Sequence, residues 1–164
     1  MKIQGKTVLI TGACSGIGKI MARRCLEKGA KQVIIWDINE AAIAATVEEL
    51  SAKGHVHGFK ADISSAASVD TAYEATKVGC GNVDILINNA GIITNNKVFS
   101  EQTDADIDRT IDINTKGAMY VTLRFLKDMK AQGSGHICNI TSSAGMLALP
   151  KMALYAASKW AAIG

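Results

Sequence analysis

The sequence lacks the features that mark membrane-spanning and nucleic-acid-binding proteins. No segment approaches the roughly 18 consecutive apolar residues of a transmembrane helix, so we expect no membrane span. Aromatic residues are few (two Trp, three Tyr and three Phe), and 18 basic and 15 acidic residues are interspersed, for a net charge of +3. Because no basic stripe with interleaved aromatics occurs, nucleic-acid binding has no support.

Cysteine and histidine are also sparse and show no metal-binding spacing. The four cysteines form no CxxC pair, which favours reduced thiols in a cytoplasmic protein. The three histidines stand near the starts of predicted strands without further ligands nearby, so we expect no metal site. Lys2 and Lys6 flank a short polar opening, so we also expect no signal peptide.

Apolar runs alternate with segments of helical periodicity along the whole chain. The pattern predicts strands over 7–11, 32–37, 55–61, 83–87 and 136–141, helices over 16–28, 40–53, 65–79 and 104–131, and a last helix that carries Tyr155. Strands separated by helices favour a parallel sheet covered on both faces. With 164 residues, 48% of them hydrophobic, and no linker, we expect one α/β domain over residues 1–164.

The first predicted strand runs directly into a glycine-rich turn. The turn reads Thr11-Gly12-Ala13-Cys14-Ser15-Gly16-Ile17-Gly18, with the spacing G-x-x-x-G-x-G, and a helical pattern begins within it. A strand, a glycine turn and a helix place the helix N-terminus against a diphosphate, and glycine lets the backbone approach it closely. A plain structural turn is the alternative interpretation.

The second predicted strand ends in Asp37, nineteen positions beyond Gly18. An acidic residue at about this place in a βαβ unit accepts hydrogen bonds from the adenosine ribose hydroxyls. It also repels the additional phosphate of NADP, so Asp37 favours NAD. Asp37 could instead cap the following helix, although Asn39 could do so as well, and Lys19 after the glycine turn keeps NADP open.

Tyr155 and Lys159 stand four positions apart in the last predicted helix and therefore share one of its faces. A free tyrosine has a pKa of about 10, and a nearby lysine cation favours the phenolate. Such a pair can serve as the acid and base that proton transfer to or from an alcohol requires. An ordinary solvated pair on a helix surface is the alternative.

Two polar features precede this pair. Asn114 falls on the apolar stripe of the long helix, where a buried amide must be hydrogen-bonded. It could hold a water or a backbone carbonyl beside the site, or satisfy a helix distortion, and the two interpretations are compatible. The loop Thr141-Ser142-Ser143-Ala144-Gly145 follows the fifth strand, where ligands bind in open α/β sheets, although it could also be a solvated turn.

Together these residues resemble the short-chain dehydrogenase/reductase family over essentially the whole chain. The resemblance rests on six ordered motifs: Thr11-Gly12-x-x-x-Gly16-Ile17-Gly18, Asp62-Ile63, Asn88-Asn89-Ala90-Gly91, Asn114, Ser142 and Tyr155-x-x-x-Lys159. It implies a three-layer, doubly wound Rossmann-type sheet with strand order 3-2-1-4-5. It also implies an NAD site, with NADP possible, formed by Gly12, Ser15, Gly16, Ile17, Gly18, Asp37, Asp62, Ile63, Asn89, Ala90, Gly91, Tyr155 and Lys159.

The resemblance further implies a role for each catalytic residue. Tyr155 would be the acid or base on the substrate oxygen, and Ser142 would hold that oxygen. Lys159 would bind the nicotinamide ribose and favour the phenolate, while Asn114 would carry a water that links Lys159 to solvent. The implied substrate is an alcohol or ketone. Softer matches at Trp36–Asn39 and Gly135–Ile137 point toward lipophilic ones, while sugar alcohols, acyl-thioester ketones and small diketones remain open.

The chain departs from the family at its end. It stops at Gly164, five residues past Lys159, whereas family members usually add two strands and a substrate-binding segment. We therefore expect an incomplete record of a longer enzyme, and little turnover if the truncation is real. Full-length members usually form homodimers or homotetramers. A catalytically silent dinucleotide-binding protein, or an inactive fragment, is the alternative.

Overall fold

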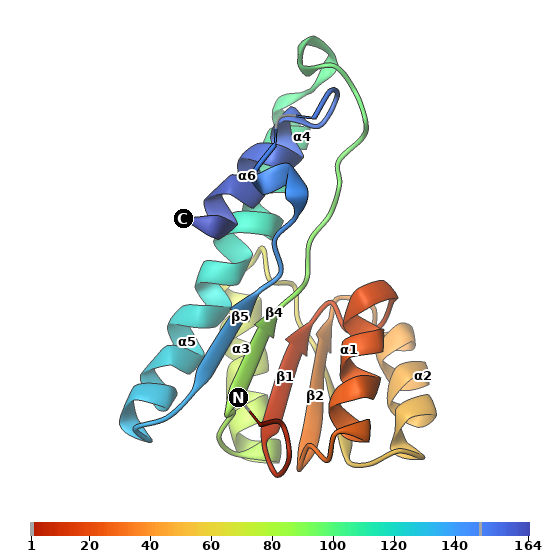
Figure 1. Cartoon of the computed structure of the whole chain (residues 1–164), viewed down its shortest axis with the longest axis vertical. Coiled ribbons are helices and arrows are strands. Elements are labelled where there is room, and N and C mark those ends of the chain that lie inside the picture. The colour runs from red at the N-terminus through yellow and green to blue at the C-terminus, as the bar shows by residue number, and fades with distance from the viewer. Residues whose placement is uncertain (1, 148) are drawn as a thin grey trace.

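A computed structural model describes residues 2–147 and 149–164, and its centre is a five-stranded parallel sheet (Figure 1). The strands lie in the order β3-β2-β1-β4-β5, as predicted. Their bounds are β1 (Thr7–Thr11), β2 (Gln32–Asp37), β3 (Val56–Lys60), β4 (Ile85–Asn88) and β5 (His136–Asn139). β1 lies in the middle, so the turn that follows it opens at the centre of the sheet's carboxyl edge.

Helices cover both faces of the sheet. α1 (Gly16–Glu27) and α2 (Glu40–Ser51) lie on one face, and α3 (Ala66–Cys80) and α5 (Ala118–Ala131) on the other (Figure 1). Alternate strand residues supply the two cores, since Ile35 packs with the first pair of helices while Ile34 packs with the second. The sheet is therefore the middle layer of the predicted three-layer, doubly wound fold.

The predicted long helix over 104–131 is one helical run with an interruption. α4 (Asp104–Ile111) and α5 are joined by a π-helical segment, η2 (Asp112–Gly117), which contains Asn114. A π-bulge shifts the direction of the side chains that follow it and often lies at a functional site. Asn114 therefore lies in a distorted part of the helix, but its side-chain amide bonds to the backbone of Ile92, outside that helix.

Above the carboxyl ends of the strands, α4 packs against α6 (Ala153–Ile163), which carries Tyr155 (Figure 1). Two short 3-10 segments, η1 (Phe99–Glu101) and η3 (Ser143–Gly145), interrupt the loops that lead to these helices. β5 is an outer strand of the sheet, as expected, and its His136 and Asn139 are exposed. Within residues 2–147 and 149–164, no helix is both long and apolar enough to cross a membrane.

Candidate active site

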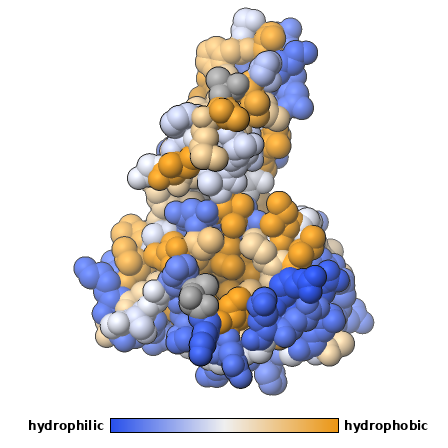
Figure 2. Space-filling model, in the orientation of Figure 1, coloured by the Kyte–Doolittle hydropathy of each residue, from blue (hydrophilic) through white to orange (hydrophobic). Residues whose placement is uncertain are grey.

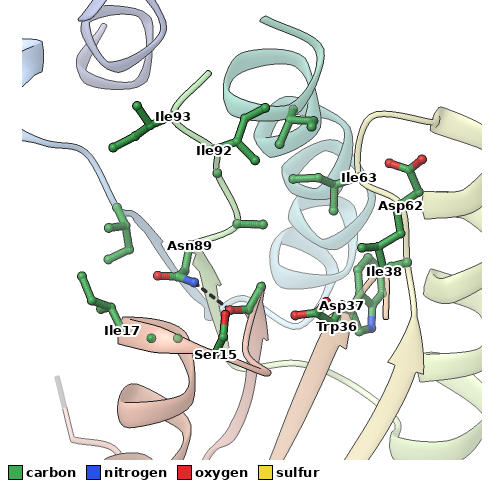
Figure 3. Close-up of a pocket in the computed structure, with 18 of the residues that line it drawn as sticks. Ser15, Ile17, Trp36, Asp37, Ile38, Asp62, Ile63, Asn89, Ile92 and Ile93 are labelled. Carbon is green, nitrogen blue, oxygen red and sulfur yellow. Dashed lines mark hydrogen bonds between the residues drawn. The ribbon is translucent and has the colours of Figure 1, made fainter. Parts of the chain in front are cut away.

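A pocket of about 520 Å³ opens at the carboxyl edge of the sheet, below α4 and α6. Apolar side chains gather in and around this recess in the space-filling view (Figure 2). Figure 3 shows that its labelled residues follow four different strands: Ser15 after β1, Ile38 after β2, Asp62 after β3 and Asn89 after β4. The volume lies within the range of cofactor and drug-sized sites.

The N-terminus of α1 faces this pocket with its first amide groups uncapped. Ser15 is the N-cap residue, but its side chain makes no capping hydrogen bond, and the first turn contains no acidic residue. The side chains of Asn39, Ser65 and Thr103 cap α2, α3 and α4, respectively. The free amides and positive dipole end of α1 are therefore available to an anionic ligand.

The glycines of the turn leave no room for side chains where the backbone segments meet. At Gly12 (φ +64°), a Cβ would lie 2.8 Å from the Cα of Ala90, and at Gly18 it would lie 2.3 Å from the Gly12 oxygen. At Gly16 (φ +49°), by contrast, a Cβ would meet nothing within 4 Å. The turn is thus packed tightly on its inner side and open on its pocket side, which fits a diphosphate.

Asp37 is held at the end of β2 by two backbone amides. Its Oδ2 accepts from the N–H of Cys14 at 3.2 Å and its Oδ1 from that of Asn39 at 3.3 Å. Asn39 itself caps α2 by accepting from the N–H of Ala42, so the helix-cap interpretation of Asp37 is wrong. Each carboxylate oxygen retains a further lone pair for a ribose hydroxyl on the pocket side.

Lys19, which kept NADP open, turns away from this pocket. Its Nζ lies 2.5 Å from Glu49 Oε2 on α2, and Lys19 lies outside the lining among the described residues. The cationic side chains in the lining are Arg109 and Lys159. The lysine is therefore paired with Glu49 instead of lining the pocket beside Asp37.

The segment Asn88–Gly91 ties the end of β4 to the glycine turn. Asn89 Nδ2 donates to the carbonyl of Thr11 at 2.9 Å. It also donates to the carbonyl of Gly12 at 3.1 Å (Figure 3). The hydroxyl oxygen of Thr11 accepts from the N–H groups of Asn89 and Ala90. These bonds hold the floor of the pocket rigidly against the turn.

Asp62 and Ile63 form the opposite wall, after β3. The Oδ1 of Asp62 accepts from both the N–H and the hydroxyl of Ser64, and its backbone N–H donates to Ser68 Oγ. Ile63 is buried and packs into the core shared with α5. The pair therefore presents one fixed carboxylate and one apolar surface to the pocket.

Tyr155 and Lys159 enter the pocket from α6, on one face of that helix. The Nζ of Lys159 lies 5.7 Å from the centre of the Tyr155 ring and donates to the carbonyl oxygen of Ile140 at 2.7 Å. Lys159 is only 6% exposed, and this burial lowers the pKa of its ammonium group. The interpretation as an ordinary solvated pair is therefore wrong.

Asn114 and Ser142 lie outside the pocket lining within residues 2–147 and 149–164. Asn114 is buried behind Gly91 and bonds to both backbone groups of Ile92. Ser142 caps η3, and its Oγ accepts from the N–H of Ala144 at 3.2 Å. All thirteen predicted cofactor residues do line the pocket, so the structure gathers that set while leaving these two beside it.

The pocket lining also contains nine residues outside the predicted cofactor and catalytic set. They are Trp36, Ile38, Ala61, Ile92, Ile93, Arg109, Ile113, Ile140 and Thr141. Arg109 and Ile113 stand four apart, so they share a helix face, and their place beside Asn114 is the one signal that could have identified them. The others simply flank predicted motifs.

A sheet of this order, with an uncapped helix N-terminus and an acidic residue after β2, defines a dinucleotide-binding α/β protein. The more specific assignment comes from comparison with known proteins. The pattern that describes short chain dehydrogenases matches residues 6–164, and the chain belongs to this family of NAD- or NADP-using oxidoreductases. The resemblance drawn from the motifs is confirmed.

Curated relatives match the chain over nearly its whole length. An uncharacterized oxidoreductase of Thermotoga maritima is 39% identical, covering 100% of this chain and 64% of the relative. Estradiol 17-beta-dehydrogenase 11 of Homo sapiens is 34% identical, covering 99% of this chain and 54% of the relative. The chain thus spans about half to two thirds of the length of these relatives.

Solved structures agree closely with the fold. A short chain dehydrogenase/reductase from Burkholderia phymatum in complex with NAD has a TM-score of 0.93 and 34% identity, covering 99% of this chain and 58% of that one. An actinorhodin polyketide ketoreductase with NADPH also has a TM-score of 0.93, with 31% identity, covering 98% of this chain and 62% of that one.

Proposed function

We propose that the protein transfers a hydride between NAD(H) and an alcohol or ketone, as an alcohol dehydrogenase or ketone reductase of the short-chain type. The observation that carries this proposal is that Tyr155 and Lys159 line the same pocket as Asp37 and the uncapped N-terminus of α1. Because an acid/base pair and a dinucleotide-binding turn line one cavity, hydride transfer is better supported than a protein that only binds a dinucleotide.

The residues present fit the cofactor. The amides of the Gly12–Gly18 turn would hold the diphosphate, Asp37 would accept from the adenosine ribose hydroxyls, and Asp62 with Ile63 would contact the adenine. Asn89, Ala90 and Gly91 would line its course toward Lys159, whose ammonium group would bind the nicotinamide ribose. Asp37 would also repel an additional ribose phosphate, so we propose NAD rather than NADP as the preferred cofactor.

When bound, the nicotinamide ring supplies or accepts the hydride, and the side chains handle the proton. Tyr155 would give its proton to, or take one from, the substrate oxygen. The buried Lys159 ammonium, 5.7 Å from the phenol ring, would favour the phenolate by its charge. Asn114 would hold a water that carries protons between Lys159 and solvent.

Ser142 would hold the substrate oxygen. Its Oγ accepts a hydrogen bond from the N–H of Ala144, so the hydroxyl hydrogen stays free to donate. A donor beside the oxygen stabilises the negative charge that develops there during transfer. The proposed division of labour therefore gives Tyr155 the proton and Ser142 the orientation of the substrate.

We propose a lipophilic small-molecule alcohol or ketone as the substrate. Ile92 and Ile93 line the pocket, and Met146, Leu147 and Leu149 are exposed in the segment between Ser142 and α6. Relatives named for estradiol and retinol support the same class. By the family resemblance, we also propose that the protein forms a homodimer or homotetramer. The four free cysteines of the chain support a location in a reducing compartment such as the cytoplasm.

The first experiment is a fluorescence titration of the protein with NADH and NADPH, followed by turnover assays on a panel of lipophilic alcohols and ketones. We expect tighter binding of NADH. Tyr155→Phe should lower turnover by about 100-fold or more while leaving the NADH dissociation constant within about twofold. Tyr120→Phe on α5 is the matched control, because it removes a phenolic hydroxyl outside the pocket.

The outcomes separate the proposed function from its alternative. NADH binding without turnover on any substrate, unchanged by Tyr155→Phe, would identify a silent dinucleotide-binding protein. Turnover that survives Tyr155→Phe would refute the role of Tyr155. Absence of binding to either cofactor would refute the whole proposal.

A further inference from the structure

Ser158 lies on α6 between the two residues of the proposed acid/base pair and is completely buried. Its Oγ donates to the carbonyl oxygen of Tyr155 at 2.7 Å. The same Oγ accepts from Asn114 Nδ2, on the π-helical segment η2, at 3.0 Å. One hydroxyl thus joins the turn that carries Tyr155 to a side chain 44 positions earlier in the sequence.

Three of the four hydrogen-bonding positions of the Asn114 carboxamide are occupied. Its Nδ2 donates to the carbonyl oxygen of Ile92 at 2.9 Å as well as to Ser158, and its Oδ1 accepts from the N–H of Ile92 at 2.8 Å. A rotation of the amide by half a turn would set two donors, Nδ2 and the Ile92 N–H, against each other. Ser158 therefore supplies the third of three contacts that define one orientation.

This orientation matters because Asn114 and Lys159 face the same small space. A Cβ at Gly91 would lie 3.2 Å from Asn114 Oδ1 and 3.6 Å from Lys159 Nζ. A displacement of the Asn114 amide would therefore change the immediate surroundings of the Lys159 ammonium group.

The Asn114–Ser158 hydrogen bond also connects two helical elements that are distant in the sequence. Across the part of the chain that the structure describes, the Asn114–Ser158 bond is the single side chain to side chain hydrogen bond between the α4–η2–α5 run and α6. A serine in a helix often satisfies its own hydroxyl by donating to a preceding carbonyl, as Ser51 does in α2 with Val47. Ser158 makes that local bond and, in addition, accepts the distant amide.

We propose that Ser158 is a positioning residue, which locks the Asn114 carboxamide and thereby sets the spacing between Asn114 and the Tyr155–Lys159 turn. The inference rests on the proposed function for its catalytic consequence. The structural claim concerns only the orientation of the Asn114 carboxamide, so it can be tested separately from the effect on catalysis.

The structural test follows the side-chain amide protons of Asn114 by NMR, with the signals identified from their loss in Asn114→Asp. In the unchanged protein these protons should exchange slowly with solvent. Ser158→Ala should speed their exchange by about tenfold or more, because one buried partner is lost. Ser158→Thr, which keeps the hydroxyl, should restore slow exchange. Ser51→Ala, which removes only a local helix bond, is the matched control and should change nothing at Asn114.

The functional test compares Ser158→Ala, Asn114→Ala and the double variant. Ser158→Ala should lower kcat about tenfold and leave NADH affinity within twofold, since Ser158 lies outside the pocket lining in the described ranges. The double variant should be no slower than Asn114→Ala, because both changes act through one contact.

Either of two results would overturn the proposal: unchanged Asn114 exchange in Ser158→Ala, or independent, multiplying losses in the double variant. If the unchanged protein shows no turnover, the proposed function fails, and the exchange experiment still decides whether Ser158 holds Asn114. If Ser158→Thr proves too large for the buried site, the comparison of Ser158→Ala with Ser51→Ala carries the same decision.

Discussion

Replacing Gly18 by alanine would test the tight contact on which the cofactor cradle depends. Gly18 is buried at the start of α1, and a Cβ there would lie 2.3 Å from the carbonyl oxygen of Gly12 and 2.6 Å from Asn89 Nδ2. Ordinary contacts between carbon and a carbonyl oxygen begin near 3.3 Å, so the helix and the turn must separate by about 1 Å.

The energetic cost can be worked from the contacts that this separation disturbs. Asn89 Nδ2 donates to the carbonyls of Thr11 and Gly12, and displacement of its amide weakens two hydrogen bonds worth about 1 kcal/mol each. Forcing a methyl group into a packed region costs about 1–3 kcal/mol more. Because alanine in a helix regains about 1 kcal/mol over glycine, we expect Gly18→Ala to lower the free energy of unfolding by about 2–4 kcal/mol, which many domains survive.

The same displacement moves the amides of α1 away from the position that a diphosphate requires. NADH affinity should therefore fall by at least about tenfold, measured by fluorescence at a temperature where circular dichroism shows the variant folded. Urea unfolding measures the stability loss. Gly79→Ala is the matched control: it lies in α3, its Cβ would come no closer than 3.4 Å to Phe59, and alanine favours helix by about 1 kcal/mol. A Gly18→Ala protein with unchanged stability and NADH affinity would refute the reasoning.

Three further predictions follow from single side chains. Asp37→Ala should weaken NADH binding about tenfold and reduce the ratio of NADH affinity to NADPH affinity, measured by paired titrations. An unchanged affinity ratio would show that Asp37 does not select between the two cofactors. Burial, together with the Asp37 carboxylate, raises the pKa of Cys14 to about 11 from near 9, so alkylation followed by mass spectrometry should accelerate up to about pH 11, and a midpoint near 9 would contradict this. Because the fold holds that thiol proton more tightly than the unfolded chain does, Cys14 should cost stability as pH rises from about 9 to 11. Tyr73→Phe, which removes the 2.9 Å bond to Asp128, should lower the unfolding free energy by about 1 kcal/mol in urea; no loss would mean that solvent replaces the bond.

The accuracy of the sequence predictions varied with the range of the interactions involved. The strands and helices were predicted within a few residues, because apolar runs and helical periodicity are local signals. The edges were less accurate: β5 ends at Asn139 instead of residue 141, and β4 begins at Ile85 instead of residue 83. Strand ends depend on pairing with neighbouring strands, which a single segment does not encode.

The residues of the site likewise differ in how well they could be predicted from the sequence. The glycine turn, Asp37 and the Tyr155–Lys159 pair could be predicted because each combines a distinctive residue type with a fixed spacing. Arg109 and Ile113 were not predicted, since their place in the lining depends on how α4 and η2 lie over the sheet. The exclusion of Lys19 from the pocket likewise depends on Glu49, which belongs to another helix.

By itself, the sequence determined the order of strands and helices, the glycine-rich turn and the residues able to bind a dinucleotide and move a proton. These follow from side-chain chemistry and from periodicities of a few residues. Only the tertiary structure decided that Lys159 is buried beside Tyr155, that Asn114 lies in a π-helical segment, and that Ser158 bonds to it. Those features arise where segments distant in sequence exclude water and must satisfy each other's polar groups.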